Sequence, residues 1–273
     1  MMELDNKPVV VYLAYEPLGI KYLEEFIANY QIFRSGFDHD LVICFKGFSE
    51  KKLSIWENSI KINYIKFDDS NQNNDFDIGS FVRIAKKYSD RHILFLGTYT
   101  KPVTNDWLKI FLNHYKKNSI VGATASCASL ASMFLNFFFE QHTIFQQIRW
   151  GLYHLIHVKL FPNPHIRTTG FFIKGKDFLS VNFDLKKFTN KKNTNYFESG
   201  RRGLSNQLLK KGFDLIIVNS DNRSFKIHEW KNSQTYCLGN QEKLLFTDNR
   251  TEEYKNSSIK EKEKRAKFCW GTL

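Results

Sequence analysis

Two short stretches of the sequence combine acidic or cationic side chains with glycine or proline. In "ESGRRG", Glu198 precedes the pair Arg201 and Arg202. In "PNPHIRTTG", His165 and Arg167 lie close together. A glutamate can take the proton from an attacking hydroxyl group, and an arginine can bind two phosphate oxygens at once. These residue types could together serve proton transfer and the neutralisation of negative charge on a bound group.

A third stretch, "DFDIGS", leads into a helical pattern and contains Asp75, Asp77 and Gly79. Asp77 and Gly79 could contact the base or ribose of a nucleotide, since glycine lets a ligand approach the backbone at a helix start. Asp77 could equally cap the helix that begins near Gly79, and Glu198 could cap the helix that follows it. The residues alone leave both interpretations open.

The elements that must position these residues alternate between apolar strands and amphipathic helices. Strand patterns lie at 8–15, 39–47, 61–69, 91–98 and 118–126, with helical patterns between them at 19–33, 49–59, 75–90 and 104–117. This order predicts an α/β fold with a mostly parallel sheet and helices on both faces. Ligands bind such sheets at the carboxyl ends of the strands, which makes Ala14, Tyr15 and Glu16 candidate nucleotide-binding residues.

Residues 128–161 are helical in period but carry more aromatic bulk than one buried stripe needs. They predict a helical insertion, either a helix pair packed on the sheet or a partly exposed aromatic surface that rests on a membrane or closes over an acceptor. The insertion falls within a domain that we place at 1–240. Residues 241–273 form a charged C-terminal extension.

The formal charge of +12 is spread along the chain rather than clustered. An anionic membrane surface or a phosphorylated substrate therefore suits it better than nucleic acid, which dense basic stripes bind. The four cysteines stand singly, as expected in a reducing cytoplasm. The sequence shows neither a signal-peptide pattern nor an apolar run long enough to cross a bilayer.

Motifs for dinucleotides, the P-loop and serine hydrolysis are absent. The order of elements over residues 8–230 instead resembles the GT-A glycosyltransferases, in particular the family 2-like enzymes of bacterial surface polysaccharide synthesis. The similarity lies in "VVVYLAY" leading into a helix, in "DFDIGSFVRIAKKYSDRHILFL", in "RTTGFFIKGKDFLSVNF" and in "FESGRRGLSNQLLKKGFDLIIV". A later stretch, "DNRTEEYK", also resembles a recurrent element of some of these enzymes.

The resemblance implies transfer of a sugar from a UDP-, GDP- or dTDP-linked donor to a saccharide or lipid-linked acceptor. It matches Glu198 to the first acid of the family's Glu-Asp pair, with Ser199 in place of the second. Glu198 would then be the general base of an inverting displacement. The protein would work in the cytoplasm, at the inner face of the membrane. The alternative is a catalytically silent module that binds nucleotide sugars or glycans.

Family members commonly hold Mg²⁺ or Mn²⁺ with an Asp-x-Asp motif after the central strand, where this chain has "GTYT" at 97–100. Three arrangements stay open. Hydroxyl groups at 97–100 are poor metal ligands compared with carboxylates, so the metal could instead be bound by Asp75 and Asp77 of the preceding loop. The four basic residues named above could replace it as diphosphate or acceptor contacts. The chain could also bind without catalysing.

Overall fold

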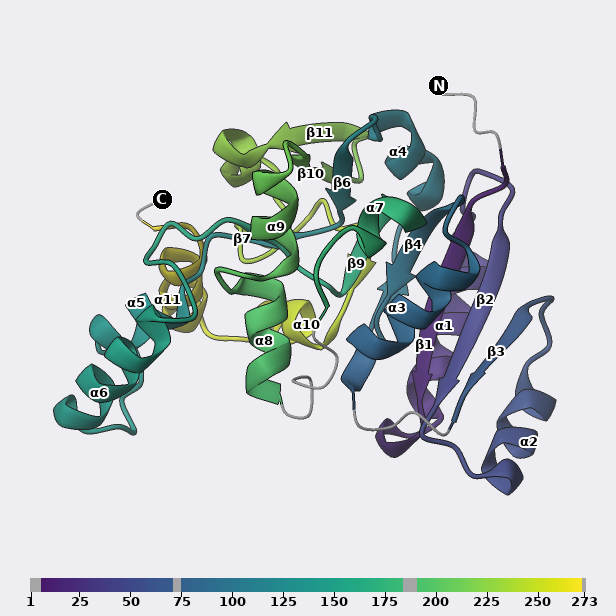
Figure 1. Cartoon of the computed structure of the whole chain (residues 1–273), viewed down its shortest axis with the longest axis horizontal. Coiled ribbons are helices and arrows are strands. Elements are labelled where there is room, and N and C mark those ends of the chain that lie inside the picture. Colours follow the sequence, from purple (N-terminus) through teal and green to yellow (C-terminus); the bar gives the residue numbers. More distant parts are fainter. Residues whose placement is uncertain (1–5, 71–74, 184–190, 272–273) are drawn as a thin grey trace.

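The computed structural model describes residues 6–70, 75–183 and 191–271 and contains a central sheet of eight strands. In order across the sheet these are β11 (Arg223–Lys226), β10 (Asp214–Asn219), β6 (Ser119–Gly122), β9 (Gly170–Lys174), β4 (His92–Leu96), β1 (Val9–Tyr15), β2 (Asp40–Lys46) and β3 (Ile65–Asp69). Only β9 and β11 run antiparallel to their neighbours in this sheet. The predicted α/β fold with a mostly parallel sheet is confirmed (Figure 1).

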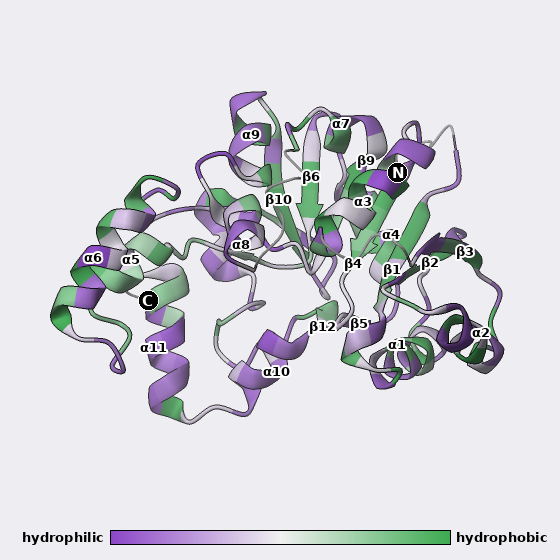
Figure 2. Cartoon of the chain, turned by 60° about the horizontal axis from the view of Figure 1, so that its bottom comes forward, coloured by the Kyte–Doolittle hydropathy of each residue, from purple (hydrophilic) through white to green (hydrophobic). Residues whose placement is uncertain are grey.

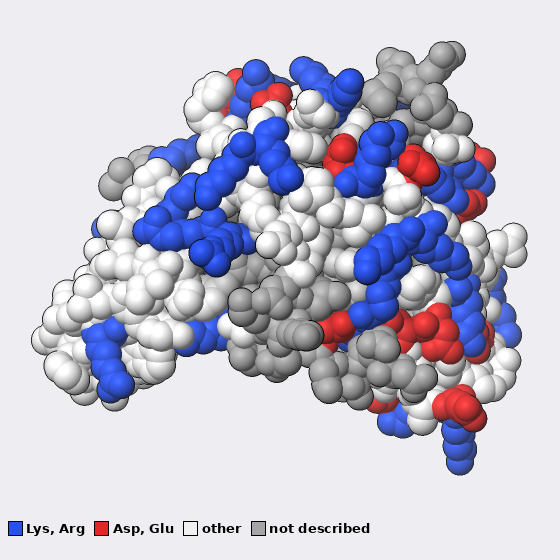
Figure 3. Space-filling model, viewed as in Figure 1, with Lys and Arg blue, Asp and Glu red and all other residues white. Residues whose placement is uncertain are grey.

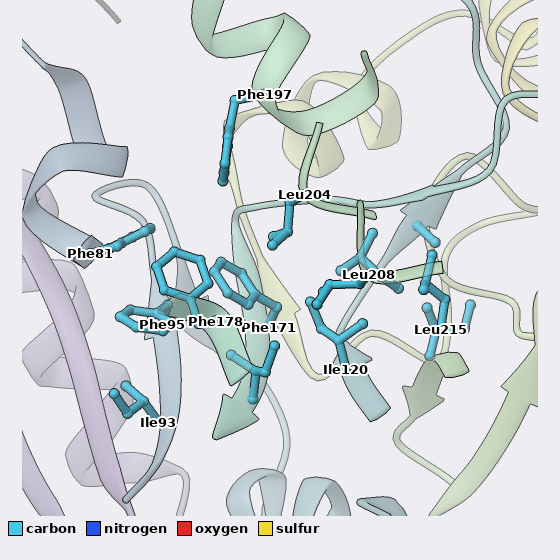
Figure 4. Close-up of a cluster of buried hydrophobic side chains, with 14 of the residues drawn as sticks. Phe81, Ile93, Phe95, Ile120, Phe171, Phe178, Phe197, Leu204, Leu208 and Leu215 are labelled. Carbon is cyan, nitrogen blue, oxygen red and sulfur yellow. The ribbon is translucent and has the colours of Figure 1, made fainter. Parts of the chain in front are cut away.

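Helices cover both faces of this sheet. One face packs under α3 (Phe76–Lys87), α7 (Gly175–Leu179) and α9 (Leu204–Lys210), and the other under α1 (Lys21–Ile32), α2 (Glu50–Ser59) and α4 (Trp107–His114). Successive residues of β1 join opposite cores, because side chains alternate across a strand. Burial on both sides explains why the parallel strands read as continuous apolar runs. Figure 4 shows the first core, where Phe95, Phe171 and Phe178 pack together.

Two small two-stranded sheets pair segments that are far apart in the sequence. β12 (Phe246–Thr247) pairs with β5 (Lys101–Pro102), and β7 (Ala125–Ser126) pairs with β8 (His165–Ile166). The first pairing brings the C-terminal segment to the chain that follows β4. The second brings the predicted site residue His165 beside the chain that follows β6.

Residues beyond 240, which we expected to form a charged extension, contribute to both cores. Phe246 packs on the α1 side, while Tyr254 and Trp270 pack on the α3 side. This segment contains α10 (Asn249–Lys255) and α11 (Ile259–Trp270). Its apolar side chains are therefore part of the folded body, and its hydrophilic residues are concentrated in α10 and α11 (Figure 2).

The aromatic-rich insertion forms α5 (Leu130–Leu135) and α6 (Ile144–Leu155), which pack on each other at one end of the molecule (Figure 1). We call residues 130–155 the helical lobe. Gly151 allows the close approach, because a Cβ there would lie 2.6 Å from the Leu135 side chain. Across the described ranges, no helix has both the length and the apolar character needed to span a bilayer.

The remaining helical segments connect these parts. They are the 3-10 helix η1 (Glu16–Leu18), α8 (Lys191–Ser199) and the 3-10 helix η3 (Ile227–Asn232). Of these, α8 carries Glu198 and lies directly below α9 in Figure 1.

Candidate active site

Glu198 lies in the last turn of α8, and its carboxylate is fastened to the loop that leads into β9. Its Oε2 accepts hydrogen bonds from the backbone N–H of Thr168 at 3.1 Å and from the Thr168 hydroxyl at 2.7 Å. Because β9 is antiparallel to β4, with Gly170 opposite Leu96, this loop lies at the carboxyl end of β4. Glu198 is therefore held at the edge where open α/β sheets bind ligands.

The capping interpretation of Glu198 is wrong. The N-cap of α9 is Gly203, and Glu198 is near the C-terminus of its own helix. A carboxylate there faces the negative end of the helix dipole, which is an unfavourable position for a residue retained only for helix stability. The two hydrogen bonds from Thr168 hold the carboxylate in this position.

His165 is the nearest ring to this carboxylate. Its Nε2 lies 3.9 Å from Glu198 Oε1, and its Nδ1 lies 2.7 Å from the carbonyl oxygen of Asn163. A carbonyl only accepts, so the neutral ring carries its proton on Nδ1 and leaves a lone pair on Nε2. Burial lowers the pKa of His165 below its ordinary value of 6.5, although the charge of Glu198 opposes this shift. Two hydrogen-bond acceptors thus lie side by side.

Asp77 belongs to the first turn of α3, and its carboxylate accepts a hydrogen bond from the N–H of Ile78 at 3.1 Å. Burial, together with the charge of Glu198, raises the pKa of Asp77 to about 6. The structure therefore brings two carboxylates from separate predicted motifs into electrostatic contact. The N-cap position of α3 is Asp75, which does not support Asp77 as the cap.

Asp75 is enclosed by cations. Its Oδ1 lies 2.5 Å from Lys46 Nζ, and its Oδ2 lies 2.6 Å from the guanidinium of Arg83. Burial opposes ionisation, but the hydrogen bonds from Arg83 and Lys46 hold the pKa of Asp75 below its ordinary value. Gly79 is packed against this carboxylate, since a Cβ there would lie 1.9 Å from Asp75 Oδ2.

The same cations also bind Asp69, at the end of β3. Arg83 Nε donates to Asp69 Oδ1 at 2.6 Å, and Ser80 donates to Asp69 Oδ2 at 2.6 Å. Lys46, at the end of β2, is 1% exposed and lies 3.6 Å from Asp69 Oδ2. This buried network fixes the start of α3, and thus Asp77, relative to β2 and β3.

The hydroxyl-rich segment 97–100 joins β4 to the loop before β9. Both the N–H of Gly97 and the hydroxyl of Thr100 donate to the carbonyl of Thr169, at 3.1 and 2.7 Å. The buried Tyr12 hydroxyl donates to the carbonyl of Thr98 at 2.7 Å. These side chains therefore serve strand-to-loop connection at the place where an Asp-x-Asp motif would bind a cation.

The described residues form no cage made of protein ligands alone for a divalent cation. Segment 97–100 has no carboxylate, and both oxygens of Asp75 are occupied by Lys46 and Arg83. Within ranges 6–70, 75–183 and 191–271, no group of three His, Cys, Asp or Glu residues is arranged to hold a metal. Asp77 contributes one carboxylate, and Mg²⁺ sites commonly combine one or two carboxylates with water and substrate phosphates.

Arg167 is already neutralised within the protein. Its guanidinium lies 2.8 Å from Asp248 Oδ2 and 3.3 Å from the Thr124 hydroxyl, and it stacks 3.9 Å above the Tyr236 ring. Asp248 also caps α10 through the N–H groups of Arg250 and Thr251. The stretch "DNRTEEYK" thus acquires a physical role, since its aspartate joins α10 to the sheet.

Arg201 and Arg202 follow the C-terminus of α8. They line a cavity of about 860 Å³ together with Tyr196, Lys210 and Lys211, and Glu198 is not part of its lining. Arg201 also donates from Nε to the carbonyl of Leu155 at 3.1 Å. The two arginines therefore line a cavity whose lining does not include Glu198.

The predicted residues of the first strand divide into buried and edge positions. Ala14 is fully buried in the core beneath α1. Tyr15 is half-buried against Gly47, whose φ of +77° suits glycine. Glu16 begins η1 and forms an ion pair with Lys52. Tyr15 and Glu16 thus lie at the carboxyl edge, whereas the Ala14 side chain contacts only the core.

Comparison with known proteins adds a likeness of fold. No protein-family model and no curated protein matches the sequence. Among similar solved structures, the galactosyltransferase LgtC with donor and acceptor sugar analogues has 12% identity and a TM-score of 0.44, over 78% of this chain and 73% of that one. The apo form of the bifunctional glycosyltransferase WbbM has 11% identity and a TM-score of 0.43, over 96% and 44%.

A third solved structure is core-mannan synthase A of Aspergillus fumigatus in an Mn/GDP form. It has 8% identity and a TM-score of 0.38, over 76% of this chain and 70% of that one. The identities and TM-scores of all three structures are too low to indicate which reaction this chain catalyses. This chain also spans less than half of the length of WbbM. The chemistry must be argued from the site.

Sequence reasoning missed several residues that build this site. Thr168 was visible only as part of "RTTG", and its role depends on a helix that follows it in the chain. Lys46 and Arg83 carried no local motif, although each lies in or beside a predicted element. A cation at the carboxyl end of a fully buried strand, as Lys46 is, was a signal that could have been used.

Proposed function

We propose that this chain is a glycosyltransferase that moves a sugar from a nucleoside-diphosphate donor to a hydroxyl group of an acceptor, with Glu198 as general base. One observation carries the proposal. Glu198 Oε2 is anchored by Thr168, while Oε1 lies 3.9 Å from His165 Nε2. Glu198 Oε1 and His165 Nε2 are both hydrogen-bond acceptors, so a ligand hydroxyl placed between them would have an acceptor for the proton that it must lose.

The proposed step balances as a single displacement. The acceptor hydroxyl gives its proton to Glu198 Oε1 while its oxygen bonds to the anomeric carbon, and the bond from that carbon to the diphosphate breaks. The diphosphate departs with the electron pair, and the configuration at the anomeric carbon inverts. The neutral imidazole of His165 accepts a hydrogen bond from the same ligand and helps to orient it.

Asp77 adds negative charge near this reaction centre. With a pKa of about 6, it is mostly ionised at pH 7. Positive charge develops on the sugar ring in glycosyl transfer, and a second carboxylate favours that charge electrostatically. Asp77 and Gly79, with Tyr15 and Glu16 across the same edge, remain our candidates for contact with the nucleotide.

The basic residues take different parts in this proposal. Arg167 is held by Asp248, so we assign it to positioning the loop before β9. Arg201 and Arg202 line a cationic cavity, and we assign them to the departing diphosphate, whose negative charge they would neutralise, or to an anionic group of the acceptor. A saccharide with a lipid-linked phosphate has such a group, and we place the reaction in surface polysaccharide synthesis at the cytoplasmic face of the membrane.

The test is release of nucleoside diphosphate from a panel of UDP-, GDP- and dTDP-sugars, with saccharide and lipid-linked acceptors present. Glu198→Gln should lower the acceptor-dependent rate by about a hundred- to ten-thousand-fold, because it removes the base and keeps the shape. The exposed Glu242→Gln is the matched control and should leave the rate unchanged.

Two results would contradict the proposal. Equal rates for wild type and Glu198→Gln would remove Glu198 from the mechanism. Binding of donor without release, for every acceptor tried, would favour a silent binding module instead.

A further inference from the structure

The longer helix of the helical lobe, α6, buries small and polar residues and exposes large apolar ones. The residues that α6 buries are Gln147, Gly151 and His154. Its exposed side carries large apolar residues, of which Ile144, Phe145 and Leu152 are 68%, 75% and 56% exposed. A surface helix of a globular protein normally shows the reverse arrangement, with its apolar stripe turned inward.

Specific contacts hold α6 in this orientation. The Gln147 side chain accepts from the N–H of Phe139 at 3.3 Å and donates to the carbonyl of His142 at 3.1 Å. His154 is hydrogen-bonded to the Tyr196 hydroxyl at 2.7 Å and stacks on the Phe134 ring. The buried side chains of Gln147 and His154 thus both have hydrogen-bond partners, which stabilises the orientation in which the apolar side of α6 faces solvent.

The exposed apolar surface continues beyond α6. Ile156, at its C-cap, is 71% exposed, and Leu160 and Phe161 are 51% and 38% exposed. On the opposite flank Phe137 is 47% exposed. Exposing neighbouring apolar side chains of this size to water costs free energy, so such a surface is typical of a site that binds a membrane or another molecule.

The charges around this surface are mainly positive. Glu140 is the only acidic residue between positions 128 and 161, and it is paired with Lys264. Lys192 lies 3.8 Å above the Tyr153 ring, and the cationic cavity beside α6 adds Lys210 and Lys211 to its two arginines. Figure 3 shows lysine and arginine side chains gathered beside the nearly uncharged lobe.

We propose that the helical lobe docks on an anionic phospholipid surface, with α6 lying in the interface and the neighbouring cationic cavity facing the headgroups. A helix of 12 residues is about 18 Å long and lies along a bilayer surface rather than crossing it. A second copy of this chain is a poorer occupant, because two surfaces ringed by cations repel each other. This inference is independent of the reaction catalysed.

The experiment is cosedimentation of the full chain with vesicles, without any substrate. Phosphatidylcholine vesicles that contain about one third phosphatidylglycerol should bind it much more tightly than phosphatidylcholine alone, and added salt should weaken the binding. The double variant Phe145→Gln with Leu152→Gln should lower the partition coefficient by at least about tenfold. Its matched control is Ile32→Gln with Ile259→Gln, because those residues are 66% and 78% exposed elsewhere.

A second pair of variants tests the charge. Lys210→Gln with Lys211→Gln should lower binding to the anionic vesicles by about fivefold or more, while the exposed pair Lys51→Gln with Lys86→Gln should have little effect. The native circular dichroism spectrum of each variant checks that it is folded.

Several outcomes would overturn the inference. It fails if the wild type stays in the supernatant with anionic vesicles, or if the lobe variant binds as the control does. It also fails if the protein is a dimer without lipid and the Phe145 and Leu152 substitutions dissociate it, since the covered surface would then belong to a second copy.

Discussion

The electrostatic contact between Asp77 and Glu198 makes a quantitative prediction about stability and pH. Asp77 has an ordinary pKa of 3.8 that burial and the charge of Glu198 raise to about 6 in the folded chain. The folded state therefore holds a proton more tightly than the unfolded state does. Stability from this group is fully present below pH 3.8 and is lost as the pH rises through about 6.

The magnitude follows from these two values. Between pH 4.5 and 7.5 the wild-type protein should lose about 2 kcal/mol of unfolding free energy through Asp77 alone. Asp77→Asn does not titrate, so it should lose that much less over the same interval. Any loss or gain from the amide itself is the same at each pH and cancels in the difference.

Urea unfolding followed by tryptophan fluorescence, at several pH values between these limits, measures the difference. The exposed Asp90→Asn serves as the control and should track the wild type. In a Glu198→Gln background the effect of Asp77→Asn should shrink, because one cause of the raised pKa is gone. A wild-type to Asp77→Asn difference that is constant with pH, within about 0.5 kcal/mol, would refute the contact.

Two other substitutions test the surroundings of the site, both by urea unfolding. Arg167→Met should destabilise the fold by about 3–5 kcal/mol, because it leaves Asp248 buried without its cation, and adding Asp248→Asn should recover part of the loss. Full stability of Arg167→Met would argue against a buried pair. Gly79→Ala should cost several-fold more stability than Gly97→Ala, because its Cβ would meet Asp75 at 1.9 Å whereas the Gly97 Cβ would have its nearest neighbour at 3.8 Å. Equal effects of the two alanines would contradict that packing.

Much of the fold was predictable because its signals are local. The apolar runs at 8–15 and 91–98 contain β1 and β4, and the amphipathic pattern that begins near residue 19 contains α1. Alternating strands and helices restrict the topology to a mostly parallel sheet, as found. The antiparallel β9 was not foreseen as such, since its apolar run looks like that of any buried strand.

The candidate site was only partly predictable. Glu198 and Asp77 were each singled out by residue type and by their place beside helices, but no pattern linked them. Their contact arises because α3 and α8 both reach the carboxyl edge of the sheet. Arg167, chosen as a phosphate ligand by its chemistry, has its charge taken by Asp248 from a segment we had assigned to a separate extension.

The sequence by itself thus determined the strands, the helices and the set of chemically able side chains, because each of these depends on residue type and on neighbours within a few positions. Which carboxylates meet, which cations stay unpaired and which side of α6 faces water depend on contacts between distant segments. Those contacts form only when the chain closes its cores, because charge neutralisation and burial are properties of the packed molecule. Thr100 illustrates this: residue type alone showed a hydroxyl where a carboxylate was expected, and only the tertiary structure showed that this hydroxyl donates to the carbonyl of Thr169.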